Sequence, residues 1–353
     1  MPIFLPLSIA LLVAAAVLAI LTGKGMLRPL WRNRHGLIRV PWRIVLFVLF
    51  ILAAVIALTL LLAPFRKLLP RAEGATALEN APLPTMILGY ALLTVAILLA
   101  SAAAARWLDR RPFAGIGLGL HSRWLRDLGL GLGLGALFIT GVVAVQAALG
   151  ALRLAPSGEA GGEILRHTVL YLLFFIGVAF VEELLFRGFA LQALAEGIGK
   201  VPAALLLSAP FGFIHHFNSG GTWIGAVSTG VAGLLLCLAY FRTRSLWLPV
   251  GMHVTWNFFM GYVWSLPVSG VTLPVVPFTV TTIGPDWVSG GSFGPEGSFL
   301  SFVGMGLMAL WIGRSRWFEP GPDTEAWYPP PEVRMAAAVA PEGNDAEERD
   351  RTA

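Results

Sequence analysis

The sequence predicts an all-α fold, a polytopic transmembrane helical bundle of about eight or nine spans. Composition is the first reason: 56% of the 353 residues are hydrophobic, only 13% are charged, and the mean hydropathy is +0.75. In a soluble globular domain, roughly a quarter of the residues are charged. The second reason is a series of apolar stretches close to the length of about 20 residues that spans a bilayer as a helix. These stretches cover about 3–22, 44–64, 84–105, 128–149, 168–190, 201–217, 222–241, 246–266 and 298–313, the sixth and the ninth being short.

The third reason is the uneven division of lysine and arginine between the loops. Alternate loops hold 17 of these residues, whereas the loops on the other side hold 5. Basic loops stay in the cytosol, so the N-terminus is predicted outside and the C-terminal tail inside. The many Ala, Gly and Arg residues suggest a bacterial source. We therefore expect a multi-pass protein of the cell membrane, in a bacterial inner membrane.

Three regions are expected along the chain. Residues 1–111 hold about three N-terminal spans, residues 112–318 form the core, and residues 319–353 form an acidic cytosolic tail. The tail carries nine acidic residues against three arginines and is rich in Pro and Ala, a composition typical of disorder. The positive charge lies in the membrane part, where it sets topology. The expected surroundings are therefore a lipid bilayer, and no nucleic-acid partner is indicated.

Ionisable side chains are costly at membrane depth and usually mark function. The span 168–190 ends with Glu182, Glu183 and Arg187 in the segment FVEELLFRGF. Glu183 and Arg187 are four residues apart, so they share a helix face and are expected to form an ion pair. Glu182 lies about 100° further round the helix and has no partner nearby in the sequence. A carboxylate in that position suits a general base.

Two further spans carry polar side chains in helical spacing. Phe211 and His215 lie four apart in PFGFIHHF, and His216 follows directly. Adjacent residues on a helix point in different directions, so His216 is expected to face away from the glutamates. His253 and Asn257, in VGMHVTWNFF, are also four apart and share a face. Both can donate hydrogen bonds to an oxygen that becomes negative in a transition state.

Together these groups make a hydrolase that needs no covalent nucleophile, because water is the attacking group. Two readings from other classes remain open. A non-catalytic membrane protein, such as an immunity or partner-binding protein on the same scaffold, has no need of unpaired charge in lipid. A proton-coupled transporter would use the glutamates as a relay, but the internal repeats common in transporters are not found.

The three motifs in order, EExxxR, FxxxH and HxxxN, resemble those of the CPBP (Abi) family of intramembrane glutamic endopeptidases, which includes the type II CAAX prenyl proteases. The similar region runs from about residue 112 to residue 312, and the segments RTRSLWLPVGMHVTWN and GGSFGPEGS also look like that family. The resemblance implies that Glu182 activates water with help from His215, and that His253 and Asn257 stabilise the oxyanion. It implies that Glu183, Arg187 and Phe211 support the site.

The resemblance also implies a peptide or protein substrate, C-terminal or membrane-associated, that reaches the active site from the cytosol. It does not imply that this substrate is prenylated. No cofactor is expected, since a glutamate-activated water needs no metal and the chain lacks HExxH. Zinc at Glu182, His215 and His253 is the alternative, because these three side chains are a possible three-ligand set.

Overall fold

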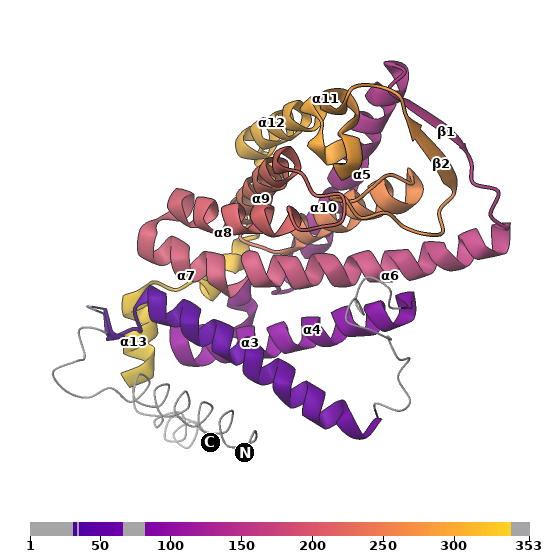
Figure 1. Cartoon of the computed structure of the whole chain (residues 1–353). Coiled ribbons are helices and arrows are strands. Elements are labelled where there is room, and N and C mark those ends of the chain that lie inside the picture. The colour runs from indigo at the N-terminus through magenta and orange to yellow at the C-terminus, as the bar shows by residue number, and fades with distance from the viewer. Residues whose placement is uncertain (1–30, 34, 66–81, 340–353) are drawn as a thin grey trace, which may run out of the picture.

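The structure is a computed structural model that describes residues 31–33, 35–65 and 82–339 (Figure 1). Nearly all regular secondary structure in these residues is helical, which confirms the all-α prediction. The predicted first span, 3–22, lies outside the described residues. The helices are α3 (Val40–Leu62), α4 (Leu83–Ala103, continued by a π-helix at Ala104–Asp109), α5 (Trp124–Ala148), α6 (Gly161–Phe186), α7 (Phe189–Ile198), α8 (Lys200–His215), α9 (Trp223–Thr243), α10 (Trp247–Phe258, continued by a π-helix at Phe259–Val263), α11 (Asp286–Ser289), α12 (Phe299–Arg314) and α13 (Pro331–Val339).

Five segments of the described chain are helical, long and apolar enough to cross a bilayer: α3, α4, α5, α6 with α7, and α9. The helices α8 and α12 are apolar but shorter, as predicted for the sixth and ninth stretches. Every other predicted stretch within the described residues falls on a helix.

Helix α6 runs through the middle of the bundle, with α3 and α4 on one side and α5 and α8 to α12 on the other (Figure 1). The α4 helix packs directly on α6 and on α3, so these two N-terminal helices belong to the same bundle as the core. Two short strands that the sequence analysis did not predict, β1 (Leu152–Pro156) and β2 (Phe278–Thr282), pair antiparallel at one end.

The glycine-rich sequence of α5 allows an unusually close approach to α10. A Cβ atom added to Gly131 would lie 2.3 Å from the carbonyl oxygen of Leu248, and one added to Gly135 would lie 2.2 Å from that of Met252. Glycine lets helix backbones come together in this way. This contact fixes α10, which carries two of the candidate site residues.

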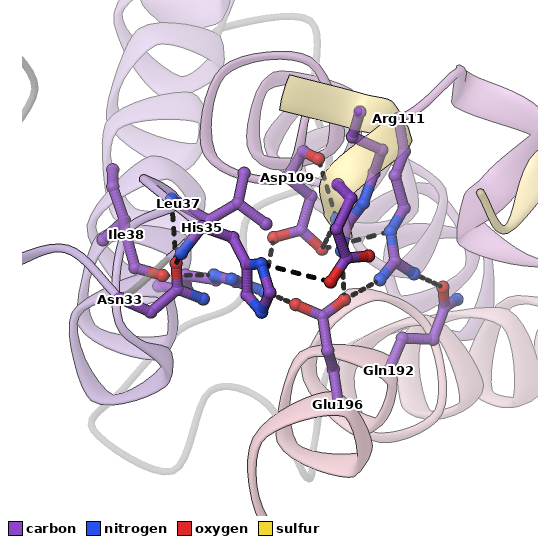
Figure 2. Close-up of polar contacts among 11 residues, drawn as sticks. Asn33, His35, Leu37, Ile38, Asp109, Arg111, Gln192 and Glu196 are labelled. Carbon is purple, nitrogen blue, oxygen red and sulfur yellow. Dashed lines mark hydrogen bonds and ion pairs between the residues drawn. The ribbon is translucent and has the colours of Figure 1, made fainter. Parts of the chain in front are cut away.

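At the end of the bundle away from the β1–β2 pair, five charged side chains meet in a charge cluster (Figure 2). They come from four helical segments and one loop. Arg43 Nη1 lies 2.9 Å from Glu196 Oε1 and 3.1 Å from Asp109 Oδ1. Arg111 and Arg334 also pair with Glu196, and Arg334 Nη1 donates to the Asp109 carbonyl oxygen over 2.8 Å. The cluster holds three guanidinium groups and two carboxylates, and it links α3, α7 and α13 to the end of α4.

The expectation of a disordered tail over 319–353 is wrong for residues 319–339. This part folds back on the bundle and contains α13. Thr324 is fully buried, and the Tyr328 hydroxyl lies 3.1 Å from that of Tyr240 in α9. Composition missed this docking because it depends on partners far away in the sequence.

Substitutions at different members of the charge cluster should lower the free energy of unfolding by different amounts. Glu196→Gln leaves three guanidinium groups sharing Asp109 and should lower the free energy of unfolding by about 3–5 kcal/mol. Arg334→Met leaves two charges of each sign and should cost about 1–3 kcal/mol. The exposed Arg316→Met is the control and should change stability by less than about 0.5 kcal/mol. Unfolding of the purified protein in detergent tests the order, and a larger loss for Arg334→Met than for Glu196→Gln would contradict it.

Candidate active site

The last turn of α6 carries the predicted ion pair. Arg187 Nη1 donates to Glu183 Oε1 over 3.0 Å, and both side chains are almost fully buried, which confirms the pairing. Arg187 Nη2 donates to the Gly233 carbonyl oxygen of α9 over 3.2 Å. The guanidinium also lies 4.4 Å from the ring centroid of Phe211 in α8, within the range of a cation–π contact. The pair therefore connects α6 with α8 and α9.

Glu183 has a second partner that the sequence analysis did not predict. His253 Nδ1 lies 2.8 Å from the same oxygen, Glu183 Oε1, while its Nε2 lies 3.6 Å from Glu182 Oε2. An ionised carboxylate only accepts hydrogen bonds, so the Nδ1 atom of His253 carries a proton. Glu183 thereby orients the imidazole ring of α10 so that Nε2 faces Glu182.

His215 is oriented by its own helix. Its Nδ1 atom lies 2.6 Å from the Phe211 carbonyl oxygen. The ring of Phe211 also packs against the imidazole, at a centroid distance of 4.9 Å. A carbonyl oxygen accepts, so Nδ1 is the protonated nitrogen here as well. In the neutral ring, Nε2 then keeps its lone pair and is free to accept a hydrogen bond from water.

A cavity of about 560 Å³ brings the four predicted site residues together: Glu182, His215, His253 and Asn257 all line it. Asn257 lies one turn beyond His253 on α10 and is largely buried. His216 is absent from the wall and stacks instead on Trp223 at 4.1 Å, as its position next to His215 predicted. The remaining wall consists mainly of Met86, Tyr90, Phe174, Phe175, Val178, Phe211, Phe217, Asn218, Ser219, Thr229, Trp256, Val268, Ser269, Val271, Thr272, Leu273 and Glu296.

Sequence analysis missed a second carboxylate in this wall, that of Glu296. Its Oε1 atom accepts from Trp256 Nε1 over 2.8 Å, and its Oε2 atom accepts from Ser269 N over 2.9 Å and Ser269 Oγ over 2.7 Å. Burial raises the pKa of Glu296, whereas these donors favour the ionised form. Glu296 thus ties the segment after α10 to α10 itself. The only signal in the sequence was the GGSFGPEGS segment that contains it.

The N-terminal spans also contribute to the cavity, through Met86 and Tyr90 of α4. The ring of Tyr90 packs edge-on against Phe174 at a centroid distance of 5.3 Å. A Cβ atom added to Gly177 of α6 would lie 2.9 Å from Tyr90 Cβ, so the glycine permits this contact. No motif pointed to these residues, because only the packing of α4 on α6 brings them to the site.

Zinc at Glu182, His215 and His253 stays a prediction. The donor types of Glu182, His215 and His253 suit zinc. No group of three His, Cys, Asp or Glu side chains in the described part of the chain is arranged to hold a metal ion. No step of the chemistry below is therefore derived through a metal.

Comparison with known families agrees with the motifs. Residues 164–259 match the family model described as type II CAAX prenyl endopeptidase, Rce1-like. This stretch begins in α6 and ends just after α10, so it contains all four predicted site residues, and it confirms the predicted resemblance. A search of curated proteins and a search of solved structures gave no match. Tyr90 and Glu296 lie outside the matched stretch.

The two adjacent glutamates should respond differently to the same substitution. Glu183→Gln leaves Arg187 and His253 without their shared carboxylate and should lower the free energy of unfolding by about 3–5 kcal/mol. Glu182→Gln is the matched control, since Glu182 is bound to neither cation by a hydrogen bond, and it should unfold close to the parent protein. Thermal unfolding in detergent measures both, and equal losses would contradict this division of roles.

Proposed function

We propose that the chain is an intramembrane endopeptidase in which Glu182 activates the attacking water. The observation that carries this proposal is the position of Glu182, which lines the cavity with His253 Nε2 at 3.6 Å from its Oε2 atom. Its Oε2 atom is buried with no hydrogen-bond partner in the part of the chain that the structure describes. Glu183, by contrast, is bound to two other side chains and does not line the cavity. A carboxylate that faces a cavity and accepts no hydrogen bond from the protein is available as a general base.

The attack step uses two positions in the cavity, one beside the imidazole of His215 for the water and one beside the imidazole of His253 for the oxyanion. A water molecule between Glu182 and His215 Nε2 gives one proton to the Glu182 carboxylate while its oxygen bonds to the peptide carbonyl carbon. The carbonyl oxygen becomes an oxyanion, which accepts hydrogen bonds from Asn257 Nδ2 and His253 Nε2–H. Donors fixed in place before the reaction stabilise such a charge without reorganising. His253 donates from Nε2 only as an imidazolium ion, whose charge Glu182 and Glu183 offset.

The cleavage step returns the proton. Protonated Glu182 transfers it to the amide nitrogen as the carbon–nitrogen bond breaks, which releases an amine and a carboxylic acid. One carboxyl group thus acts as base and then as acid. The buried ion pair with Arg187 holds the Glu183 carboxylate in place throughout, so that His253 stays oriented.

Glu182→Gln should reduce peptide cleavage by a factor on the order of 10²–10⁴, because an amide cannot accept the proton of water. A peptide library in detergent, followed by mass spectrometry, measures the loss. The matched control is the unfolding measurement described above, which separates lost chemistry from lost fold. Cleavage by Glu182→Gln at the parent rate would overturn the proposed role.

A chelator such as phenanthroline should leave the cleavage rate unchanged if Glu182 and His215 activate water alone. Metal content of the purified active protein is measured in parallel. Loss of activity on chelation, with recovery on return of stoichiometric zinc, would instead recast Glu182 and the histidines as metal ligands.

A further inference from the structure

Asn257, the proposed amide donor to the oxyanion, is positioned by its helix rather than by a bond of its own. In the described part of the chain, no hydrogen bond joins its side chain to another residue. The side chain lines the cavity and is largely buried. The direction of its amide therefore depends on how the last turn of α10 is rotated about the helix axis.

That turn is also where α10 stops being a regular α-helix. A π-helix, Phe259–Val263, begins two residues after Asn257. Such segments interrupt the regular backbone hydrogen-bond ladder and are frequent at functional sites. The regular ladder therefore holds the turn from one side only, and side-chain bonds to neighbouring elements fix its rotation.

Two adjacent residues of α10 supply these bonds. Thr255 Oγ1 donates to the Leu132 carbonyl oxygen of α5 over 2.8 Å, and Trp256 Nε1 donates to Glu296 Oε1 over 2.8 Å. Adjacent residues on a helix point about 100° apart, so the two bonds hold the turn in two directions. The bond to Glu296 is the one within the cavity wall, where Trp256 and Asn257 are neighbours.

Glu296 is itself held in place by three other parts of the bundle. Its Oε2 atom accepts two hydrogen bonds from Ser269, in the segment after α10. Its own carbonyl oxygen accepts one from Ser228 Oγ of α9 over 2.5 Å. The preceding carbonyl oxygen, that of Pro295, accepts from Ser298 Oγ at the N-cap of α12 over 2.7 Å. The carboxylate is therefore fixed independently of any substrate, as a supporting group of a reactive site must be.

The two carboxylates of the cavity wall thus differ in what they can do. Both oxygens of Glu296 accept hydrogen bonds from the protein. Glu182 Oε2, by contrast, accepts none within the described residues. Glu296 is therefore suited to anchoring a donor, whereas Glu182 has an oxygen left for water.

We propose, on the basis of the function proposed above, that Glu296 is a positioning residue of the reaction, which acts through Trp256 to aim the Asn257 amide at the oxyanion. In this role Glu296 touches neither the water nor the peptide carbonyl. Loss of the bond between Trp256 and Glu296 lets the turn rotate, and a displacement of about 1 Å near the reacting atoms lowers the rate by on the order of 10²-fold. Because the oxyanion forms only after the substrate has bound, the loss falls on kcat and not on KM.

Trp256→Phe removes the Nε1–H donor and keeps an aromatic ring in the cavity wall. For a peptide that the parent protein cleaves in detergent, we expect kcat to fall by about 10- to 100-fold and KM to stay within about twofold. Glu296→Gln can no longer accept hydrogen bonds at both ends of its side chain, so it should lower kcat in the same way.

Trp264→Phe is the matched control, because Trp264 lies on the π-helical extension of α10 but outside the cavity wall. Its Nε1 atom donates to Thr140 Oγ1 over 3.1 Å, so the same substitution removes the same kind of bond. We expect kcat and KM of this variant to stay within about twofold of the parent values.

A double-mutant cycle with Asn257 separates positioning from a merely structural effect. Asn257→Ala alone should lower kcat by about 10²–10³-fold, the usual effect of losing an oxyanion donor. Adding Trp256→Phe should then lower kcat no further, because the group that it positions is already gone. A further loss of the same size in the double variant, a parent kcat in Trp256→Phe, or a rise in KM at unchanged kcat would each overturn the proposal.

Glu296→Gln takes the place of Trp256→Phe in the cycle if the latter does not fold, and failure of both to fold would make Glu296 a structural residue only. The same kinetics distinguish this inference from the proposed function. If the parent cleaves no peptide, or Glu182→Gln cleaves at the parent rate, the proposed function fails. If Glu182→Gln is inactive and Trp256→Phe keeps the parent kcat, only the positioning role fails.

Discussion

The candidate site depends on one oxygen atom, Glu183 Oε1, which binds both Arg187 at 3.0 Å and His253 at 2.8 Å. Through these two contacts a single buried carboxylate holds the imidazole of α10 and the guanidinium at the end of α6, which in turn binds the Gly233 carbonyl oxygen of α9. Removing a carboxylate from between two buried cations leaves charge without compensation, which is far more costly than losing a surface pair. The neighbouring Glu182 takes no part in the ion pair with Arg187 and lines the cavity, where its Oε2 atom lies 3.6 Å from His253 Nε2.

Helical spacing predicted most of this site because the relevant contacts lie within single helices. Residues four apart share a face, so the Glu183–Arg187 pair and the common face of His253 and Asn257 followed from the sequence. The convergence of three helices on one cavity came from recognising the order of the motifs. The bond between His253 and Glu183 was not predicted, since it joins residues 70 positions apart, and its length depends on how α10 packs against α5 and α6.

The structural features that the sequence did not predict are those whose partners lie far away along the chain. Glu296 was hidden in a glycine- and proline-rich segment read as an outer loop, yet it binds Trp256 and Ser269 and closes part of the cavity. The acidic composition of the tail suggested disorder, but Arg334, which pairs with Glu196, lies on the short docked helix α13.

The central claim is that Glu182, His215, His253 and Asn257 surround one reacting carbonyl. The most direct measurement is an experimental structure of the protein with a peptide phosphinate, whose two oxygens mimic the attacking water and the oxyanion. The account predicts one phosphinate oxygen within hydrogen-bond distance of Glu182 and His215, and the other facing His253 Nε2 and Asn257 Nδ2. A phosphinate bound outside this cavity, or held there by a metal ion, would contradict it.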